Sequence, residues 1–237
     1  MEIALNLVGG IISSILAVFV VEAYRLMRTR YDHRALRQVT QFSESRCAII
    51  APTFPVEATE LPRPTGLLTL SDATALAYVL DVCSTIKCQT TVVSHKRIES
   101  DIGSGIICIG GSFGNDATKS MLNTYCAGFH IHSEGGFRAT YYQCGEHRFG
   151  ADPENAYAFV VKLSSGYTGL PGNVILLWGH YGVATTAAAY FLVRDAKALA
   201  ALKKESFFVA LSLNLSLGYR SISTSMVDLS DVALIRR

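Results

Sequence analysis

The sequence predicts an α/β protein with a Rossmann-like mixed sheet and a β-rich insert, preceded by one N-terminal transmembrane helix. Three observations predict this class. The chain of 237 residues opens on an uncharged apolar run, short apolar runs then alternate with segments of helical periodicity, and closely spaced aromatic and β-branched runs interrupt this alternation near the middle. The expected organisation is a transmembrane helix over residues 1–24, a basic helical stalk over 25–45 and one α/β domain over 46–237.

The first segment is expected to span a membrane. Residues 3–21 carry no charged side chain, and a helix of about twenty apolar residues crosses the hydrocarbon core of a bilayer. Five arginines follow between positions 25 and 37. By the positive-inside bias they keep the C-terminal domain cytoplasmic and the N-terminus outside an inner or plasma membrane. Gly9 and Gly10 would let a second helix approach closely, so a homo-oligomer through this helix is possible.

A secretory signal peptide is the alternative for this segment, because Val21, Glu22 and Ala23 have the small-residue spacing of a cleavage site. Two features favour the membrane helix. The segment lacks the basic residues that precede the apolar part of a signal peptide. The arginines directly after it would also oppose translocation of the chain.

The first part of the domain is expected to form a βαβ unit. Residues 47–51 are a short apolar run closed by Pro52, which is typical of a buried strand followed by a loop. A helix capped by Ser71 or Asp72 follows, because apolar residues recur there at helical spacing. Residues 90–93 then form the next strand.

The middle of the domain is expected to hold the β-rich insert. Residues 106–109 predict a strand that runs into a glycine-rich loop and then into a helix over 117–125. The runs at 129–133, 137–143 and 157–163 leave no room for helices between them. They predict antiparallel strands, or a hairpin, added to the sheet.

The last part of the domain returns to the alternation of strand and helix. Residues 173–178 predict a strand, 183–202 an alanine-rich helix, and 207–213 and 222–227 the closing strands. Threonine and charged residues interrupt the alanine-rich helix before about twenty apolar residues accumulate. It is therefore not expected to be a second membrane span.

The charge and the cysteine content limit which partners, metals and cofactors are expected. The net charge is +2 and most basic residues are scattered, so no DNA or RNA polymer is expected to bind. The six cysteines are expected to be reduced, because Cys47 and Cys108 lie in apolar runs. A zinc site needs two close pairs of Cys or His, and pairs such as Cys83 with Cys88 have no matching second pair. Neither a metal nor a cofactor is expected.

The first glycine-rich loop follows the strand at 106–109. Glycines directly after a buried strand let the backbone approach a ligand and point the amides of the next helix at an anion. The loop is not G-x-G-x-x-G and lacks the lysine of a P-loop. The alternative is a tight strand-to-helix turn capped by Asn115 or Asp116. The candidate ligand-binding residues here are Gly110, Gly111, Ser112, Asn115 and Asp116.

The second glycine-rich loop repeats this order of strand, glycines and helix. Its candidate ligand-binding residues are Gly179, His180, Gly182, Thr185 and Thr186. In open α/β sheets ligands bind beyond the carboxyl ends of the strands, so both loops are expected to flank one crevice, which suits a nucleotide-like anion. The alternative for the histidine is a hydrogen-bonded loop residue without a chemical role.

The insert supplies acidic and histidine side chains for acid or base chemistry, but their spacing identifies no nucleophile with its base. No catalytic residue is therefore assigned. Neither Ser112 nor Ser133 lies in a G-x-S-x-G elbow, so an α/β-hydrolase is not expected. The insert residues considered are His130, His132, Glu134, Glu146 and His147.

The run from Gly110 to Asn115 resembles a glycine-glycine-x-x-x-asparagine element of poorly characterised prokaryotic Rossmann-like proteins. The layout, an N-terminal membrane helix joined to a cytosolic Rossmann-like domain, is similar to that of membrane-tethered CARF sensors. That resemblance implies binding of cyclic oligonucleotides in antiviral signalling.

Three functions follow from these expectations. The leading one is a non-enzymatic sensor that binds a nucleotide-like anion and signals to the membrane helix. The second is a hydrolase of glycosidic or phosphodiester bonds in nucleotides, with Asp116, Glu134 or His180 as acid or base. The third is a membrane-anchored scaffold without a ligand.

Overall fold

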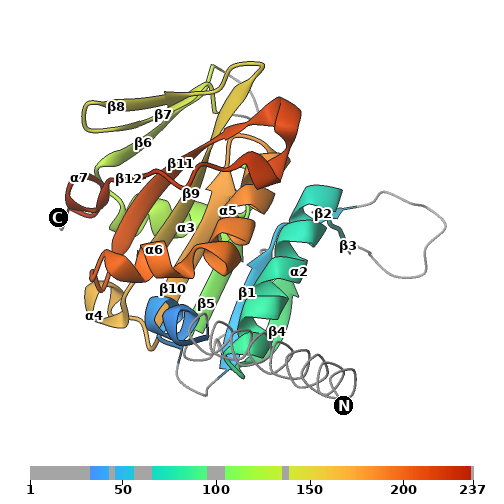
Figure 1. The fold of residues 1–237 in the computed structure, drawn as a ribbon, viewed down its shortest axis with the longest axis vertical. Helices are drawn as coiled ribbons and strands as arrows, with labels where there is room; N and C mark the ends of the chain where they lie inside the picture. Colours follow the sequence, from blue (N-terminus) through green and yellow to red (C-terminus); the bar gives the residue numbers. More distant parts are fainter. Residues whose placement is uncertain (1–32, 43–45, 56–65, 95–104, 135–138, 236–237) are drawn as a thin grey trace, which may run out of the picture.

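The computed structural model describes residues 33–42, 46–55, 66–94, 105–134 and 139–235 (Figure 1). The expected transmembrane helix over residues 1–24 lies outside this part of the chain. Within the described residues, no helix combines the length and the apolar character needed to cross a bilayer.

The core of the protein is a mixed sheet, which confirms the α/β class. Its described part has seven strands in the order β12-β11-β9-β10-β5-β1-β4. Neighbours from β10 to β4 run parallel, whereas β9, β11 and β12 join antiparallel. The strands are β1 (Arg46–Ala51), β4 (Gln89–Ser94), β5 (Gly105–Ile109), β9 (Asn155–Leu163), β10 (Asn173–Gly179), β11 (Phe207–Asn214) and β12 (Met226–Asp228).

Helices α2 (Leu70–Thr85), α5 (Gly182–Arg194) and α6 (Ala196–Ala201) lie over one face of this sheet (Figure 1). The unit β1-α2-β4 is the expected βαβ unit. The expected caps of α2 were wrong: Thr69 is the N-cap, and its Oγ1 accepts a hydrogen bond from the Asp72 amide at 3.1 Å. The expected alanine-rich helix is divided at Asp195, whose carboxylate pairs with Arg194 where the chain leaves helical geometry.

The described end of the expected stalk packs into the domain. Residues 33–40 are helical, and Leu36, Val39 and Phe42 are buried in the same core as α2 and α5. A Cβ on Gly105 would lie 2.6 Å from the Phe42 ring, so this glycine lets the ring lie directly against β5. Residues 33–42 are therefore part of the folded core.

The opposite face is covered by α3 (Asp116–Tyr125), α7 (Ser230–Ala233) and a second, antiparallel sheet. This sheet consists of β6 (Phe129–His132), β7 (Tyr141–Cys144) and β8 (His147–Gly150) and lies above the main sheet in Figure 1. The expected antiparallel strands are confirmed: the run at 157–163 joins the main sheet antiparallel as β9, as expected, whereas β6, β7 and β8 form a sheet of their own. Aromatic rings of β6, β7 and β8 pack on Phe159 and Trp178.

The remaining elements are short. β2 (Phe54–Pro55) pairs with β3 (Gly66–Leu67) beside α2. Helix α4 (Ser165–Thr168) connects β9 to β10, and the 3-10 turns η1 (Leu215–Leu217) and η2 (Tyr219–Ser221) lead from β11 to β12. All six cysteines have free thiols. Burial raises the pKa of Cys108 to about 12, so this thiol is a core residue and not a nucleophile.

Candidate functional site

Both glycine loops line one pocket of about 250 Å³ at the carboxyl ends of β1, β5 and β10. Strands β5 and β10 are parallel neighbours, so the loops that follow them leave the sheet at the same edge. This confirms the expected shared crevice, which we call the two-loop pocket. The candidate residues that line it are Gly110, Gly111, Gly179, His180, Gly182 and Thr185.

The two glycines that begin the first loop differ in what the backbone requires of them. Gly110 has φ +92°, a conformation that favours glycine, and its amide donates to the Leu177 carbonyl at 2.9 Å. Gly111 has no such backbone requirement, and a Cβ there would lie 3.4 Å from Trp178 Cδ1, an ordinary contact. Of these two glycines, Gly111 is the one that could take a side chain without strain.

Asn115 has a structural role instead of the expected ligand contact. Its side chain is fully buried, and its Nδ2 donates to the carbonyls of Ile50 at 3.0 Å and Ile109 at 2.8 Å. Its Oδ1 accepts from the amides of Ala117 at 3.0 Å and Thr118 at 3.3 Å, which caps α3. One side chain therefore joins the ends of β1 and β5 to the start of α3, and it has no capacity left for a ligand.

The other two candidates of the first loop do not reach the pocket. Asp116 is exposed and Ser112 is half-buried, and neither is among the described residues that line the two-loop pocket. Ser112 begins the turn at residues 112–114, and Asp116 is the first residue of α3. The described residues of the loop that line the pocket are therefore Gly110, Gly111, Phe113 and Gly114.

Close packing accounts for the glycines of the second loop. A Cβ on Gly179 would lie 2.3 Å from the Ala184 Cβ, and one on Gly182 would lie 2.7 Å from the Ser71 Cβ. Thr186 has a similar role, because its hydroxyl donates to the Ser71 carbonyl at 2.9 Å. These residues hold the start of α5 against the start of α2.

The start of α5 remains the best anion-binding element. In the part of the chain that the structure describes, no side chain caps its first turn, in contrast to α3, so its first amides can donate to a ligand. Thr185 lines the pocket in this turn and is 4% exposed. Its hydroxyl makes no side-chain hydrogen bond to the described part of the chain, so it can donate to a ligand oxygen.

His180 is a structural residue and not an acid or base. Its Nδ1 accepts from the Tyr157 amide at 3.2 Å, so the proton of the neutral ring is on Nε2, which donates to the Phe149 carbonyl at 3.1 Å. Burial lowers the pKa of the ring, although the hydrogen bond to the Phe149 carbonyl opposes that effect. The side chain links β8 of the insert to β9, as the alternative interpretation of this residue expected.

Sequence reasoning missed several residues of the pocket. The most important is Asp72, which lines it at 7% exposure and accepts a hydrogen bond from the Thr69 hydroxyl at 2.7 Å. Burial raises the pKa of this carboxyl, and the bond from Thr69 opposes the shift. Pro52, which directly follows β1, was open to prediction from the strand-end rule. The other missed residues are Thr69, Phe113, Gly114, Ala139, Tyr142 and Tyr181.

The acid and base candidates of the insert lie elsewhere. None of them is among the described residues that line the two-loop pocket. The His132 ring stacks on Tyr141 with centroids 4.3 Å apart, and Glu134 is exposed. Within the described residues, no group of three or more His, Cys, Asp or Glu side chains is placed to hold a metal ion.

Comparison with known proteins adds no family to this geometry. No protein-family model matches the chain, and no curated protein sequence matches it either. The function must therefore be argued from the pocket itself.

The burial of His180 predicts how stability depends on pH. Because the folded pKa lies below the ordinary value of 6.5, the unfolded state binds more protons as the pH falls below that value. The free energy of unfolding should therefore decrease from about pH 6.5 downward. His180→Phe, which cannot titrate, should be less stable at pH 7 but lose this part of the slope in chemical denaturation. Equal slopes of the free energy of unfolding against pH in the wild type and in His180→Phe would contradict the lowered pKa of His180.

Proposed function

We propose that this protein is a membrane-anchored sensor whose two-loop pocket binds a nucleotide-like anion and signals to the N-terminal membrane helix. The observation that supports it most is the convergence of the two glycine loops with the uncapped first turn of α5 in one pocket. Backbone amides at such a turn bind phosphate without a cationic side chain. The volume of about 250 Å³ is just below the usual range of small-molecule sites, so it suits part of a nucleotide, such as its phosphate and ribose, with the rest of the ligand outside.

Asp72 narrows the chemistry of the ligand. It is the only charged side chain among the described residues that line the pocket, so a bare polyanion would be repelled by it. A ligand with an anionic end and hydroxyl groups satisfies both parts of the site: phosphate oxygens accept from the α5 amides and Thr185, and ribose hydroxyls donate to Asp72. Phe113, Tyr142 and Tyr181 add aromatic surface for a base.

The hydrolase alternative has less support. Of its three proposed acid or base residues, His180 has both ring nitrogens in hydrogen bonds, and Asp116 and Glu134 are exposed outside the pocket lining. Asp72 is a single carboxyl group without a described partner acid or base in the pocket. General acid–base hydrolysis usually divides its roles between two groups.

The route of the proposed signal is α5. This helix begins in the two-loop pocket at Gly182, and the α6 helix that follows it faces residues 33–40 across a second cavity lined by Arg34, Gln38 and Lys197. A ligand that prefers one position of α5 would favour one position of the N-terminal helix. The membrane end of this route rests on the apolar run at residues 3–21.

Ligand-dependent stabilisation tests the proposal. The full chain in detergent is screened against mononucleotides, dinucleotides and cyclic oligonucleotides, because Leu36 and Phe42 belong to the core and a shorter fragment would lose them. A ligand that binds the folded state raises the melting temperature. Thr185→Val should weaken binding by about 1 kcal/mol, roughly fivefold, through loss of one hydrogen bond. Thr124→Val, on the exposed side of α3, is the control and should bind normally.

Two results would contradict the proposal. No stabilisation by any nucleotide would favour a scaffold without a ligand. Conversion of a stabilising nucleotide to products, detected by chromatography, would favour the hydrolase.

A further inference from the structure

Lys162 is a buried lysine that neither the fold nor the proposed sensor explains. It is 1% exposed in β9, where it lies opposite Ile175 and Phe207. Ala158 and Val160 on the same face of the strand belong to the apolar core. Lysine is almost never fully buried unless it is paired. No hydrogen bond or ion pair joins Lys162 to any described residue.

A cavity of about 210 Å³ gives access to this amine. Gln38, Gln41, Lys162, Lys203, Lys204 and Glu205 are among its lining residues, and we call it the Lys162 cavity. Trp178 Nε1 is the only sealed side-chain nitrogen or oxygen without a partner in the described residues. The Lys162 amine, which also lacks a partner, is therefore not sealed and remains in contact with the cavity.

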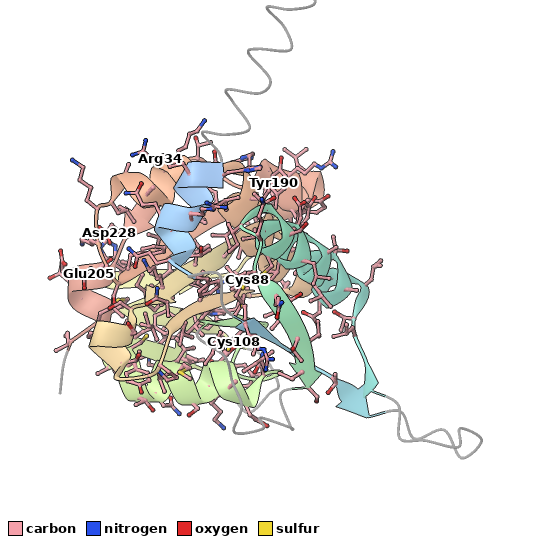
Figure 2. All side chains as sticks on the ribbon, turned by 90° about the horizontal axis from the view of Figure 1, so that it is seen from below. Arg34, Cys88, Cys108, Tyr190, Glu205 and Asp228 are labelled. Carbon is pink, nitrogen blue, oxygen red and sulfur yellow. The ribbon has the colours of Figure 1, made fainter. Side chains whose placement is uncertain are left out.

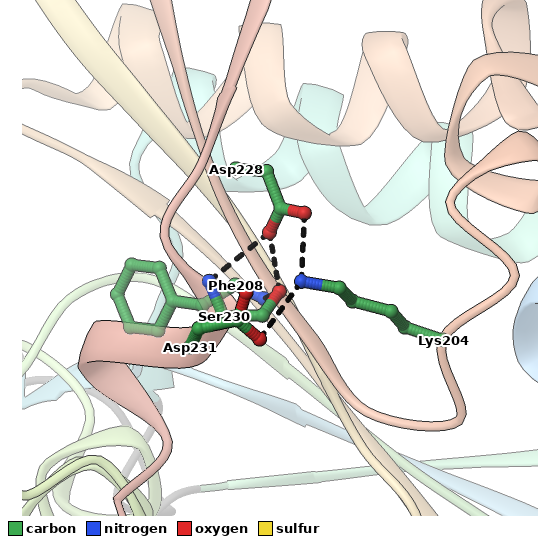
Figure 3. Close-up of polar contacts among 5 residues, drawn as sticks. All are labelled: Lys204, Phe208, Asp228, Ser230 and Asp231. Atoms are coloured by element: carbon green, nitrogen blue, oxygen red, sulfur yellow. Dashed lines mark hydrogen bonds and ion pairs between the residues drawn. The ribbon is translucent and has the colours of Figure 1, made fainter.

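The charged residues that line the cavity are three lysines and one glutamate. Figure 3 shows that one of the lysines is engaged outside the lining, because Lys204 Nζ lies 2.9 Å from Asp228 Oδ2 and 3.0 Å from Asp231 Oδ1. Asp228 is held in turn by the amide and hydroxyl of Ser230. Lys203 makes no ion pair with a described residue. Among the described residues of the lining, Lys162 and Lys203 then remain as two cationic side chains beside one acid, Glu205.

This cavity is distinct from the two-loop pocket. Lys162 pairs with Ile175 near the start of β10, whereas Gly179 at the other end of that strand lines the two-loop pocket. The wall of the Lys162 cavity includes Gln38 and Val39 from the N-terminal helical segment. Figure 2 shows this segment beside α5 and α6, with Arg34 near its outer end. Arg34 and Lys197 line the adjoining cavity, which shares Gln38 and Ala200.

We propose that the Lys162 cavity is an anion site that binds a phosphate group through Lys162 and Lys203. The ammonium groups supply the positive charge, and the side-chain amides of Gln38 and Gln41 can donate further hydrogen bonds. Burial lowers the pKa of Lys162 to about 8, with Glu205 opposing the shift, and a bound phosphate would raise this pKa again because it favours the charged amine.

The phosphate could come from a free phosphate compound or from the headgroup of an anionic lipid. The lipid source rests on the proposed membrane anchor, because the segment that leads to it forms one wall of the cavity. A free phosphate compound needs no membrane. The two sources differ in whether lipid alone stabilises the protein.

Inorganic phosphate tests the shared chemistry. The full chain in a phosphate-free, uncharged detergent is titrated with phosphate against chloride at equal ionic strength, and the melting temperature is followed. Phosphate should stabilise the wild type, and Lys162→Met should weaken this response at least about tenfold. Lys119→Met, an exposed lysine of α3, is the matched control and should respond as the wild type does. Equal responses of wild type and Lys162→Met would overturn the proposal.

Two further measurements keep the proposal testable if the variant folds poorly. In the wild type, phosphate should slow acetylation of Lys162 but not of Lys119, as followed by mass spectrometry. Unchanged acetylation of Lys162 at saturating phosphate would also overturn the site. Vesicles of phosphatidylcholine with and without phosphatidylglycerol then separate the two sources. Stabilisation by the anionic vesicles that depends on Lys162 supports a lipid headgroup. A response to inorganic phosphate without such stabilisation supports a free phosphate compound.

Discussion

Asn115→Ala is expected to lower the free energy of unfolding by roughly 3 kcal/mol or more, because several buried backbone groups would lose their partner and each costs about 1–3 kcal/mol. The side chain holds the Ile50 and Ile109 carbonyls and two amides at the start of α3 in one network. No single interaction of a surface loop would have this effect. Chemical denaturation of the purified chain measures it.

A paired substitution separates the two halves of this network. Asn115→Asp keeps the acceptor that caps α3 but loses the two donors and places a carboxylate near the carbonyls of β1 and β5. It should therefore be at least as destabilising as alanine, although aspartate is a good N-cap. Asn123→Ala, on the exposed side of α3, is the control and should change stability by less than about 0.5 kcal/mol. A tolerated Asn115→Asp would show that Asn115 acts only as a helix cap.

The sequence predicted the edge of the sheet where the pocket lies, because that prediction depends on local signals. Apolar runs closed by glycines located β5 and β10, and parallel strands place their carboxyl ends together. The same rule applied to β1 would have added a third strand end to the pocket, through Pro52. The capping role of Asn115 was one of the two alternatives that the sequence left open.

Other features depend on long-range packing that no local pattern records. Asp72 reaches the pocket because α2 packs on α5 through Ser71 and Gly182, and its position at a helix start indicated only a cap. The run at 157–163 was expected to add antiparallel to the sheet, but its place between β10 and β11 depends on partners that follow it in the chain and that its own pattern does not identify. The burial of Lys162 could not be predicted, because a lysine in an apolar strand is ordinarily exposed.

Gly111 is the glycine that can separate binding from folding. Gly110 needs its positive φ, and side chains on Gly179 and Gly182 would collide with Ala184 and Ser71. Substitution of those three residues would confuse loss of the ligand with loss of the fold. At Gly111 the backbone tolerates a Cβ, so Gly111→Val should fold while its branched side chain occupies space in the two-loop pocket.

Calorimetric titration of Gly111→Val with the nucleotide that most stabilises the wild type is the most direct test of the two-loop pocket. We expect binding at least about 100-fold weaker, equivalent to roughly 3 kcal/mol, at a melting temperature close to that of the wild type. Gly150→Val is the control, because a Cβ there meets no atom within 4 Å and the residue lies outside the pocket lining. Wild-type affinity in Gly111→Val, or equal loss in both variants, would contradict the assignment of the ligand to this pocket.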